Sequence, residues 1–304
     1  MTVWSTILRI VEAGEGACLV SVAVTEGSAP RDAGAHMVVT ARGYHGTIGG
    51  GTLEWRAIAE AQALLGRGPA VKLASHALGP DLGQCCGGRV MLVSEVFGGT
   101  SLAELRELAA REVEGAFSLS RHGRIMSFGE ERRHIYLFGA GHVGRALALA
   151  LAPLPFDVTW ADPRPEAFPA AHPANVKTVV AADPAAILAK APGASLVFVM
   201  SHSHALDLAI VDCALRNPAI AHVGVIGSAT KRARFVSRLR QAGVAEDRIS
   251  GLICPIGVAG VASKIPAAIA AATVAQILVL DEELRLARAA PEPHHGGQRA
   301  GGTP

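Results

Sequence analysis

One short segment constrains the fold of this 304-residue chain more than any other. It runs Gly139-Ala-Gly-His-Val-Gly144, with the spacing G-x-G-x-x-G, and it directly follows the apolar run at 135–138. A strand, such a loop and a helix in succession are typical of a Rossmann domain. The first glycine permits a tight turn, the second lets a phosphate approach the backbone, and the third allows close helix–strand packing. The segment predicts a phosphate-sized site at a helix N-terminus.

From residue 134 the chain alternates between strand-like and helix-like segments. Short apolar runs suited to buried strands occur at 135–138, 158–161, 178–180, 196–200 and 223–226. Between them, Asp183-Pro184 has the pattern of an N-cap followed by proline at the first helical position. We therefore predict an α/β fold, a Rossmann-type doubly wound parallel sheet over 134–288. The tail at 289–304 is rich in Gly, Pro and His, and we expect it to be disordered.

The first 98 residues predict a smaller α+β domain of different character. Strands are expected at 17–25, 36–40, 44–48 and 89–96, and a helix at 53–65 with Thr52 as its N-cap. Residues 99–133 are expected to form a structured connector. Within it, Ser101 and Glu104 have the spacing of a capping box at the start of a helix.

Asp162 stands 18 residues after Gly144, at the end of the second predicted strand of the Rossmann domain. An acidic residue there can accept hydrogen bonds from ribose hydroxyls, which favours NAD over NADP as a bound dinucleotide. The alternative is that Asp162 only caps the turn at 163–165. His142 lies inside the glycine loop itself.

Two further loops are expected at the same crevice, because ligands bind beyond the carboxyl ends of strands at the switch point of a doubly wound sheet. Ser201-His202-Ser203-His204 follows the fourth strand, and Gly227-Ser228 follows the fifth. Ser228 and Lys231, at a second helix start, suit an anion. Ordinary helix capping is the alternative, and Arg234, Arg238 and Arg240 are interpreted as a solvated face.

Gln84-Cys85-Cys86-Gly87-Gly88-Arg89 is the most unusual stretch of the chain. The two glycines let a ligand approach the backbone. Arg89 could hold a phosphate or lower a thiol pKa, and thiolates bind soft metals or carry sulfur. A tight turn with two half-buried thiols is the alternative. Gly49-Gly50-Gly51 predicts a second anion cradle in this domain, with Arg31 and Glu54 as nearby polar residues.

Composition narrows the class of partner. The formal net charge of +2 is too small to indicate nucleic acid or a membrane surface. The most apolar stretch, 265–280, is too short to span a membrane and is interpreted as a buried core helix. The N-terminus lacks the pattern of a targeting segment, so we expect a cytoplasmic protein. Five cysteines without regular spacing predict no disulfide framework, and Cys18, Cys213 and Cys254 are expected to be core residues.

Taken together, these motifs resemble those of the XdhC/CoxI family, the accessory factors of xanthine dehydrogenase and related molybdenum hydroxylases. The resemblance covers roughly residues 5–285. It is carried by Gly27-Ser-Ala-Pro-Arg31, Gly49-Gly-Gly-Thr-Leu-Glu54, Gln84-Cys-Cys-Gly-Gly88, Phe138-Gly-Ala-Gly-His-Val-Gly144, Ser201-His-Ser-His204, Gly224-Val-Ile-Gly-Ser228 and Cys254-Pro-Ile-Gly257.

The resemblance implies a chaperone that binds the molybdenum cofactor (molybdopterin) as cargo. It implies that the chain holds the cofactor during exchange of an oxo for a sulfido ligand and passes it to apo-xanthine dehydrogenase. A cysteine desulfurase, the target enzyme and a second copy in a homodimer are the implied partners. The chain would then not itself be an oxidoreductase.

Under this interpretation, residues 1–98 form the XdhC/CoxI-type domain, and Cys85 or Cys86 contacts molybdenum or relays sulfur. Which domain holds the pterin is left open, as is an NAD(P) or other nucleotide at the Rossmann site. One alternative is an NAD-dependent oxidoreductase with His202 or His204 as an acid–base group. Another is a thiol- or metal-handling protein. The expected cofactor-binding residues are Arg31, Gly49, Gly50, Gly51, Glu54, Gln84, Cys85, Cys86, Gly87, Gly88, Gly139, Gly141, His142, Gly144, Asp162, His202, His204, Ser228 and Lys231.

Overall fold

The computed structural model describes residues 2–79 and 87–289. The chain divides into two compact units, Met1–Glu131 and Arg132–Pro304. The tail predicted at 289–304 lies outside the described residues except for its first position.

The first unit is built on an antiparallel sheet with the strand order β3-β2-β1-β5-β4. Its strands are β1 (Ala17–Glu26), β2 (His36–Val39), β3 (Tyr44–Gly46), β4 (Val71–Ala77) and β5 (Arg89–Phe97). Because successive side chains point to opposite faces, Cys18 of β1 joins one core and Leu19 the other.

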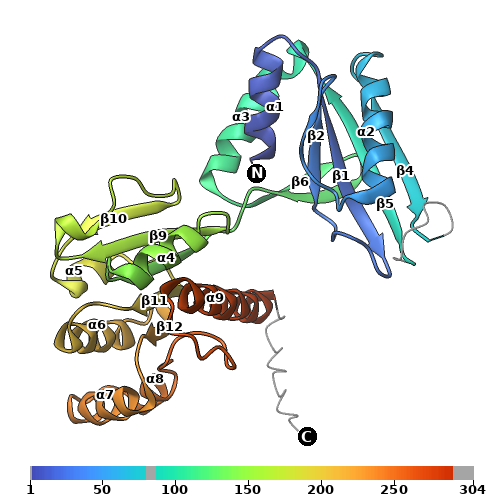
Figure 1. The fold of residues 1–304 in the computed structure, drawn as a ribbon. Coiled ribbons are helices and arrows are strands. Elements are labelled where there is room, and N and C mark those ends of the chain that lie inside the picture. Colours follow the sequence, from blue (N-terminus) through green and yellow to red (C-terminus); the bar gives the residue numbers. More distant parts are fainter. Residues whose placement is uncertain (1, 80–86, 290–304) are drawn as a thin grey trace, which may run out of the picture. The chain divides into compact units, whose positions relative to one another are not determined.

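Helices cover both faces of this sheet (Figure 1). Helix α2 (Gly51–Leu65) packs on the face that contains Cys18. The opposite face is covered by α1 (Val3–Glu12), by α3 (Leu102–Glu114) and by the hairpin of β6 (Phe117–Arg121) and β7 (Arg124–Phe128). A short 3-10 turn, η1 (Gly99–Ser101), leads into α3. The α+β character predicted for this part of the chain is confirmed.

Residues 99–131, expected to be a connector, lie within this first unit. Leu105 and Leu108 of α3 are buried in the same core as α1. The Glu112 carboxylate of α3 also accepts hydrogen bonds from the Val3 amide at 2.6 Å and the Ser5 amide at 3.1 Å. A carboxylate from another helix thus satisfies the free amides at the start of α1.

The second unit contains a parallel sheet with the strand order β10-β9-β8-β11-β12, as predicted for a Rossmann-type fold. The strands are β8 (Arg133–Phe138), β9 (Phe156–Asp162), β10 (Val176–Val180), β11 (Ser195–Val199) and β12 (Ile220–Val225). The chain reverses its direction of progress across the sheet between β8 and β11. Beyond the carboxyl ends of these two strands lies the switch point, where ligands of such sheets bind.

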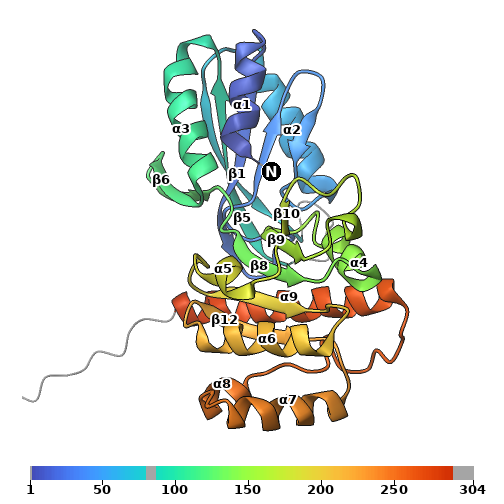
Figure 2. The same cartoon turned by 90° about the vertical axis from the view of Figure 1, so that its left-hand side faces the viewer.

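Helices flank the second sheet on both faces (Figure 2). One face packs against α4 (His142–Ala150) and α9 (Pro266–Ala289). The other packs against α5 (Pro184–Leu188), α6 (His204–Arg216), α7 (Ala229–Gln241) and α8 (Glu246–Ser250). A 3-10 turn, η2 (Pro165–Ala167), follows β9. The predicted cap at Asp183 is confirmed, because its side chain accepts the Ala185 amide at 2.9 Å.

The stretch interpreted as a buried core helix is helical but only half buried. In α9, Thr273 and Ile277 are fully buried, whereas Leu278 is 42% and Val279 53% exposed. Arg133 of β8 and Arg285 of α9 both pair with the buried Asp281 carboxylate, which ties this helix to the sheet. No helix among the described residues is long and apolar enough to cross a membrane.

Candidate functional site

The glycine loop, residues 139–144, has the tight backbone packing that its spacing predicts. Gly139 has φ +113°, and a Cβ built on it would lie 2.3 Å from the Met200 carbonyl oxygen at the end of β11. A Cβ on Gly144 would lie 2.0 Å from the Gly139 carbonyl oxygen. Around Gly141 there is open space. The first and third glycines therefore serve close packing, and the second leaves the backbone accessible at the start of α4.

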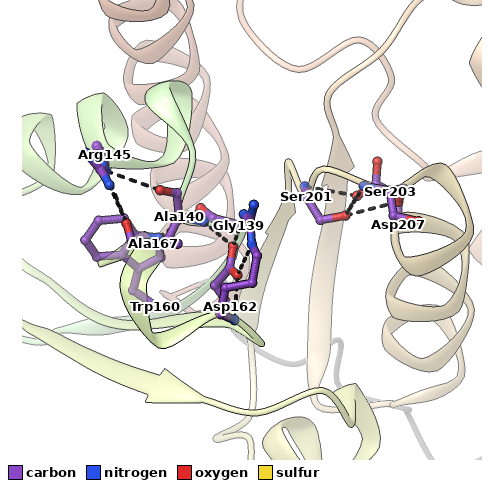
Figure 3. Close-up of polar contacts among 10 residues, drawn as sticks. Gly139, Ala140, Arg145, Trp160, Asp162, Ala167, Ser201, Ser203 and Asp207 are labelled. Atoms are coloured by element: carbon purple, nitrogen blue, oxygen red, sulfur yellow. Dashed lines mark hydrogen bonds and ion pairs between the residues drawn. The ribbon is translucent and has the colours of Figure 1, made fainter. Parts of the chain in front are cut away.

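Asp162 points back to this loop rather than outward (Figure 3). One of its carboxylate oxygens accepts the Ala140 amide at 2.8 Å, and the other accepts the Arg164 amide at 3.0 Å. The Arg164 guanidinium adds a two-pronged ion pair, and Asp162 is only 1% exposed. Burial alone would raise the pKa of Asp162, but the Arg164 side chain and these amides together lower it. A ribose would have to displace Arg164 to reach this carboxylate.

The crevice beside Asp162 is almost filled. The space enclosed by Gly139, Asp162, Ser201 and their neighbours is about 10 Å³, which is the scale of a single water molecule. Trp160 and Arg145 fix the loop further by donating to the Gly139 and Ala140 carbonyl oxygens (Figure 3). His142 is exposed at the first position of α4. In this arrangement the glycine loop is a rigid turn with one open backbone position, at Gly141.

A larger cavity lies at the same edge of the sheet, between α6 and α7. It has a volume of about 480 Å³, and we call it the α7 cavity. The two loops predicted to face the switch point both contribute to it. Its lining includes His202, His204, Ser228, Lys231, Arg234 and Arg238.

A buried ion pair holds the wall of the α7 cavity together. The Lys231 ammonium lies 2.6 Å from the Asp207 carboxylate, and Asp207 is 1% exposed. Asp207 also accepts the Ser201 hydroxyl at 2.6 Å and the Ser201 amide at 3.0 Å (Figure 3). Lys231 was predicted to be an anion ligand, but its charge is already balanced by Asp207. The pair thus links the His202–His204 loop to α7.

The starts of α6 and α7 at this edge show the ordinary side-chain capping that the sequence left open as the alternative to an anion site. The Ser228 hydroxyl accepts the Lys231 amide at 3.3 Å, and the Ser203 hydroxyl accepts the Leu206 amide at 3.4 Å. A Cβ on Gly227, just before Ser228, would lie 2.6 Å from Lys231 Cδ, so a side chain there would require the Lys231 side chain to move. Ser228 therefore acts as a cap at the rim of the α7 cavity.

The sequence interpretation of Arg234 and Arg238 as solvated agrees with their exposure, but it missed their position at the α7 cavity. Both are exposed and line the α7 cavity, rather than only facing solvent. The spacing carried a signal, because Arg234 follows Lys231 by three residues and Arg238 follows Arg234 by four, which places all three on one face of the helix. Arg240, in contrast, pairs with Glu246 outside the cavity.

In the first unit, three glycine-bearing segments meet at one end of the sheet. A Cβ on Gly49 would lie 2.5 Å from Pro30 Cβ, and one on Gly88 would lie 2.4 Å from the Ser28 carbonyl oxygen. The Gly88 amide donates to that Ser28 oxygen at 3.1 Å. Gly87, next to it, is exposed with open space around it. The segment at 26–31 thus packs closely against both of the others, backbone to backbone at Gly88 and chiefly through the Pro30 and Arg31 side chains at Gly49.

The Glu54 side chain stabilises the glycine-rich turn before α2 by hydrogen bonds to its backbone. Its carboxylate accepts the Thr47 hydroxyl at 2.5 Å, the Ile48 amide at 2.9 Å and the Gly50 amide at 3.1 Å. Burial would raise the pKa of Glu54, but these hydrogen bonds outweigh it and lower the pKa. Helix α2 begins at Gly51 with Gly50 in the cap position, so Thr52 is not its N-cap. Part of the predicted anion cradle is therefore occupied by the chain's own carboxylate.

Arg31 lines a separate cavity of about 380 Å³ in the first unit. It is exposed, and within the described ranges it forms no ion pair. The half-buried His36 ring forms one wall, where its nitrogens contact the Ser21 hydroxyl and the Ser127 carbonyl oxygen, each at 2.8 Å. Burial lowers the pKa of His36 despite the bond to Ser127. Among the described residues that line this cavity, Arg31 is thus a cation without an ion-pair partner.

Gln84, Cys85 and Cys86 lie outside the described residues. Over the ranges 2–79 and 87–289, no group of three His, Cys, Asp or Glu side chains could hold a metal ion. Cys18 and Cys254 are buried, as predicted, and Cys213 is half buried. Burial raises the pKa of the Cys18 thiol to about 12, so it is unsuited to thiolate chemistry.

Comparison with known families identifies both parts of the chain. The pattern of the XdhC and CoxI family matches residues 10–74, and that of the XdhC Rossmann domain matches residues 135–277. Together the two matches cover more than half of the chain.

Two individual proteins resemble the chain over most of its length. The uncharacterized protein YqeB of Escherichia coli (strain K12) is 30% identical over 285 residues, which is 91% of this chain and 46% of YqeB. The chain thus spans about half the length of that relative. A crystal structure described as a xanthine dehydrogenase from Bacillus halodurans has a TM-score of 0.76 at 20% identity. The match covers 96% of this chain and 98% of that one, and at this identity it shows a shared fold.

Proposed function

This chain belongs to the XdhC and CoxI family, and from that premise we propose that it is a carrier for the molybdenum cofactor. In this proposal the chain holds the cofactor as cargo during sulfuration and inserts it into apo-xanthine dehydrogenase or a related molybdenum hydroxylase. It acts as an accessory protein and is not itself a xanthine dehydrogenase. The resemblance to a structure described as a xanthine dehydrogenase is consistent with a role connected to that enzyme.

The observation that carries the proposal is the meeting of the segments 26–31, 49–51 and 87–88 at one end of the first sheet. The close packing leaves no space for a side chain at Gly49 or Gly88. Gly87 and the Arg31 and Arg89 side chains are exposed. Backbone without side chains lets a planar polar group approach closely. Exposed arginines can bind a phosphate bidentately. The pterin and phosphate of the cargo match these two properties.

The two adjacent cysteines enter the proposal through their position in the chain. Ala77 of β4 pairs with Arg89 of β5, and the Leu78 amide donates to the Gly88 carbonyl oxygen. The described neighbours on both sides of residues 80–86 therefore lie at the same sheet end as the three segments. We propose that Cys85 or Cys86 contacts molybdenum or relays sulfur. A carrier must also release its cargo, so an affinity near micromolar, ~8 kcal/mol, is expected.

The proposed partners follow from this role. A cysteine desulfurase supplies the sulfur, the apo-enzyme accepts the cofactor, and the carrier acts as a homodimer in the cytoplasm. The nucleotide that the sequence left open at the Rossmann domain is not part of this proposal. The oxidoreductase alternative has less support, because the crevice beside Asp162 holds only about 10 Å³.

The proposal is tested by anaerobic titration of the full chain with the molybdenum cofactor, followed by the absorbance of the pterin. We expect saturable binding by the wild-type chain and weaker binding by Cys85→Ala or Cys86→Ala. Cys213→Ala, a half-buried thiol of the second unit, is the matched control and should bind as the wild type does. Absence of binding to the wild-type chain would overturn the proposal.

Titration with NADH, followed by its fluorescence, separates the carrier from the oxidoreductase alternative. The filled crevice predicts no binding at micromolar NADH. Tight binding that Asp162→Asn weakens would favour the alternative instead.

A further inference from the structure

The α7 cavity has the size of a ligand site but not the composition of a typical apolar pocket. Its volume of about 480 Å³ lies within the range of roughly 300–1,000 Å³ for small-molecule sites. It opens beyond the carboxyl ends of β11 and β12, where ligands of parallel sheets bind. Three cationic side chains and one carboxylate line it.

Only two of these charges are balanced within the protein. Lys231 is neutralised by Asp207 at 2.6 Å. Arg234 and Arg238 form neither an ion pair nor a side-chain hydrogen bond with any residue in the parts of the chain that the structure covers. The cavity therefore carries two uncompensated guanidinium groups on one helix.

The placement of these two arginines is unfavourable without a partner. Like charges four residues apart on a helix destabilise it. Every other arginine of α7 is engaged elsewhere: Arg232 donates to the Leu252 carbonyl oxygen, and Arg240 pairs with Glu246. An anion between Arg234 and Arg238 would remove the repulsion, and His202 and His204 also line the facing wall of the cavity.

We propose that the α7 cavity binds a phosphoryl group of a small molecule, with Arg234 and Arg238 as its clamp. A diphosphate suits the site best, because two guanidinium groups can each bind phosphate oxygens bidentately. The Asp207–Lys231 pair holds the facing loop in position and does not itself take the ligand. This site is distinct from the glycine loop, and the inference goes beyond the carrier function and does not depend on it.

The test uses inorganic pyrophosphate and the full-length chain in isothermal titration at low ionic strength. We expect wild-type binding, a dissociation constant raised roughly tenfold or more in Arg234→Gln/Arg238→Gln, and binding weakened by added salt. Arg240→Gln removes the same charge from the same helix outside the cavity and should leave affinity unchanged. Because all three positions are exposed, the variants should fold, which thermal unfolding checks.

Absence of pyrophosphate binding at millimolar concentration would overturn the proposal, as would equal weakening by Arg240→Gln. Malonate, a dicarboxylate of similar size, should bind more weakly than pyrophosphate, and the reverse order would contradict a phosphoryl site. Competition by ADP or by the molybdenum cofactor then identifies the source of the phosphoryl group, and either competitor supports the site. Pyrophosphate contains no pterin, so this result is independent of the test of the carrier function.

Discussion

The start of α4 and the start of α7 lie at the same edge of one sheet. They differ in what the nearby buried carboxylate binds. At α4, the glycine loop has a buried carboxylate beside it, and Asp162 accepts the Ala140 amide. At α7, the nearby Asp207 carboxylate forms an ion pair with Lys231. Arg234 and Arg238 remain without counter-charges in the described structure. The glycine loop has the stronger sequence signature, yet the crevice beside it has a volume of only about 10 Å³, whereas the α7 cavity has about 480 Å³.

The start of α2 repeats the arrangement at α4 in an unrelated fold. Glu54 accepts the Gly50 amide there, as Asp162 accepts the Ala140 amide. A glycine-rich helix start therefore shows where the backbone is bare, but an adjacent buried carboxylate decides how many amides stay free. The following predictions test this contrast, from the largest expected effect to the smallest.

Asp207→Asn should have the largest effect on stability, because it leaves the largely buried Lys231 ammonium without its counter-charge. We expect a loss of about 3–5 kcal/mol in the free energy of unfolding, measured by denaturant titration. Asp207→Asn/Lys231→Met, which removes both charges, should recover much of this loss. A loss under about 1 kcal/mol in the single variant would mean that the pair is weak, as surface ion pairs are.

Gly144→Ala should destabilise the second unit by about 1–3 kcal/mol, because the new methyl group would collide with the Gly139 carbonyl oxygen. Gly141→Ala is the matched control in the same loop, since open space surrounds that position. Thermal unfolding of the two variants should differ clearly. Equal stabilities would contradict the different roles assigned to the two glycines.

Glu54→Gln and Asp162→Asn should each cost about 1–3 kcal/mol at neutral pH, because each carboxylate accepts several charge-assisted hydrogen bonds. Both pKa values are lowered in the folded state, so the stabilisation is complete above the unfolded pKa values. It is lost as pH falls through the folded values, below about pH 4. Unfolding curves from pH 7 to acid should show each variant converging on the wild type. A gap that stays constant would show that the charge is not the cause.

Arg234→Gln should have the smallest effect and the opposite sign. Without a bound anion, removing one of two like charges four residues apart should stabilise the chain by about 0.2–0.5 kcal/mol. Arg240→Gln removes a charge paired with Glu246 and should not stabilise it. Thermal unfolding in a phosphate-free buffer makes the comparison, and destabilisation by Arg234→Gln would mean that its side chain has a partner.

The sequence was sufficient for the Rossmann-type sheet, because buried parallel strands are short apolar runs with clear helix caps between them. It did not indicate β4, whose exposed Val71, Lys72 and Leu73 lack the alternation of a half-buried strand. The prediction of a capping box at Ser101 is wrong, because the Ser101 side chain forms no cap hydrogen bond and the Glu104 carboxylate pairs with Arg121 instead. Local patterns cannot show such tertiary competition for a carboxylate.

The candidate site, too, could be predicted from the sequence only in part. Spacing alone located the loops at 139–144, 201–204 and 227–231 at one edge of the second sheet. It could not show that Asp162, Glu54 and Lys231 are already engaged by partners within the chain. It predicted a solvated face for Arg234 and Arg238, which their exposure confirms, but it did not show that they line a cavity, because the facing wall comes from the earlier segment 201–207.

Transfer of the cofactor is the most direct test of the carrier function. The full chain, loaded anaerobically with sulfurated molybdenum cofactor, is mixed with cofactor-free xanthine dehydrogenase, and both bound pterin and urate formation are followed. We predict that enzyme activity appears in proportion to the cofactor lost from the carrier, and that the carrier alone forms no urate. Cofactor that stays on the chain while the enzyme remains inactive would contradict the account.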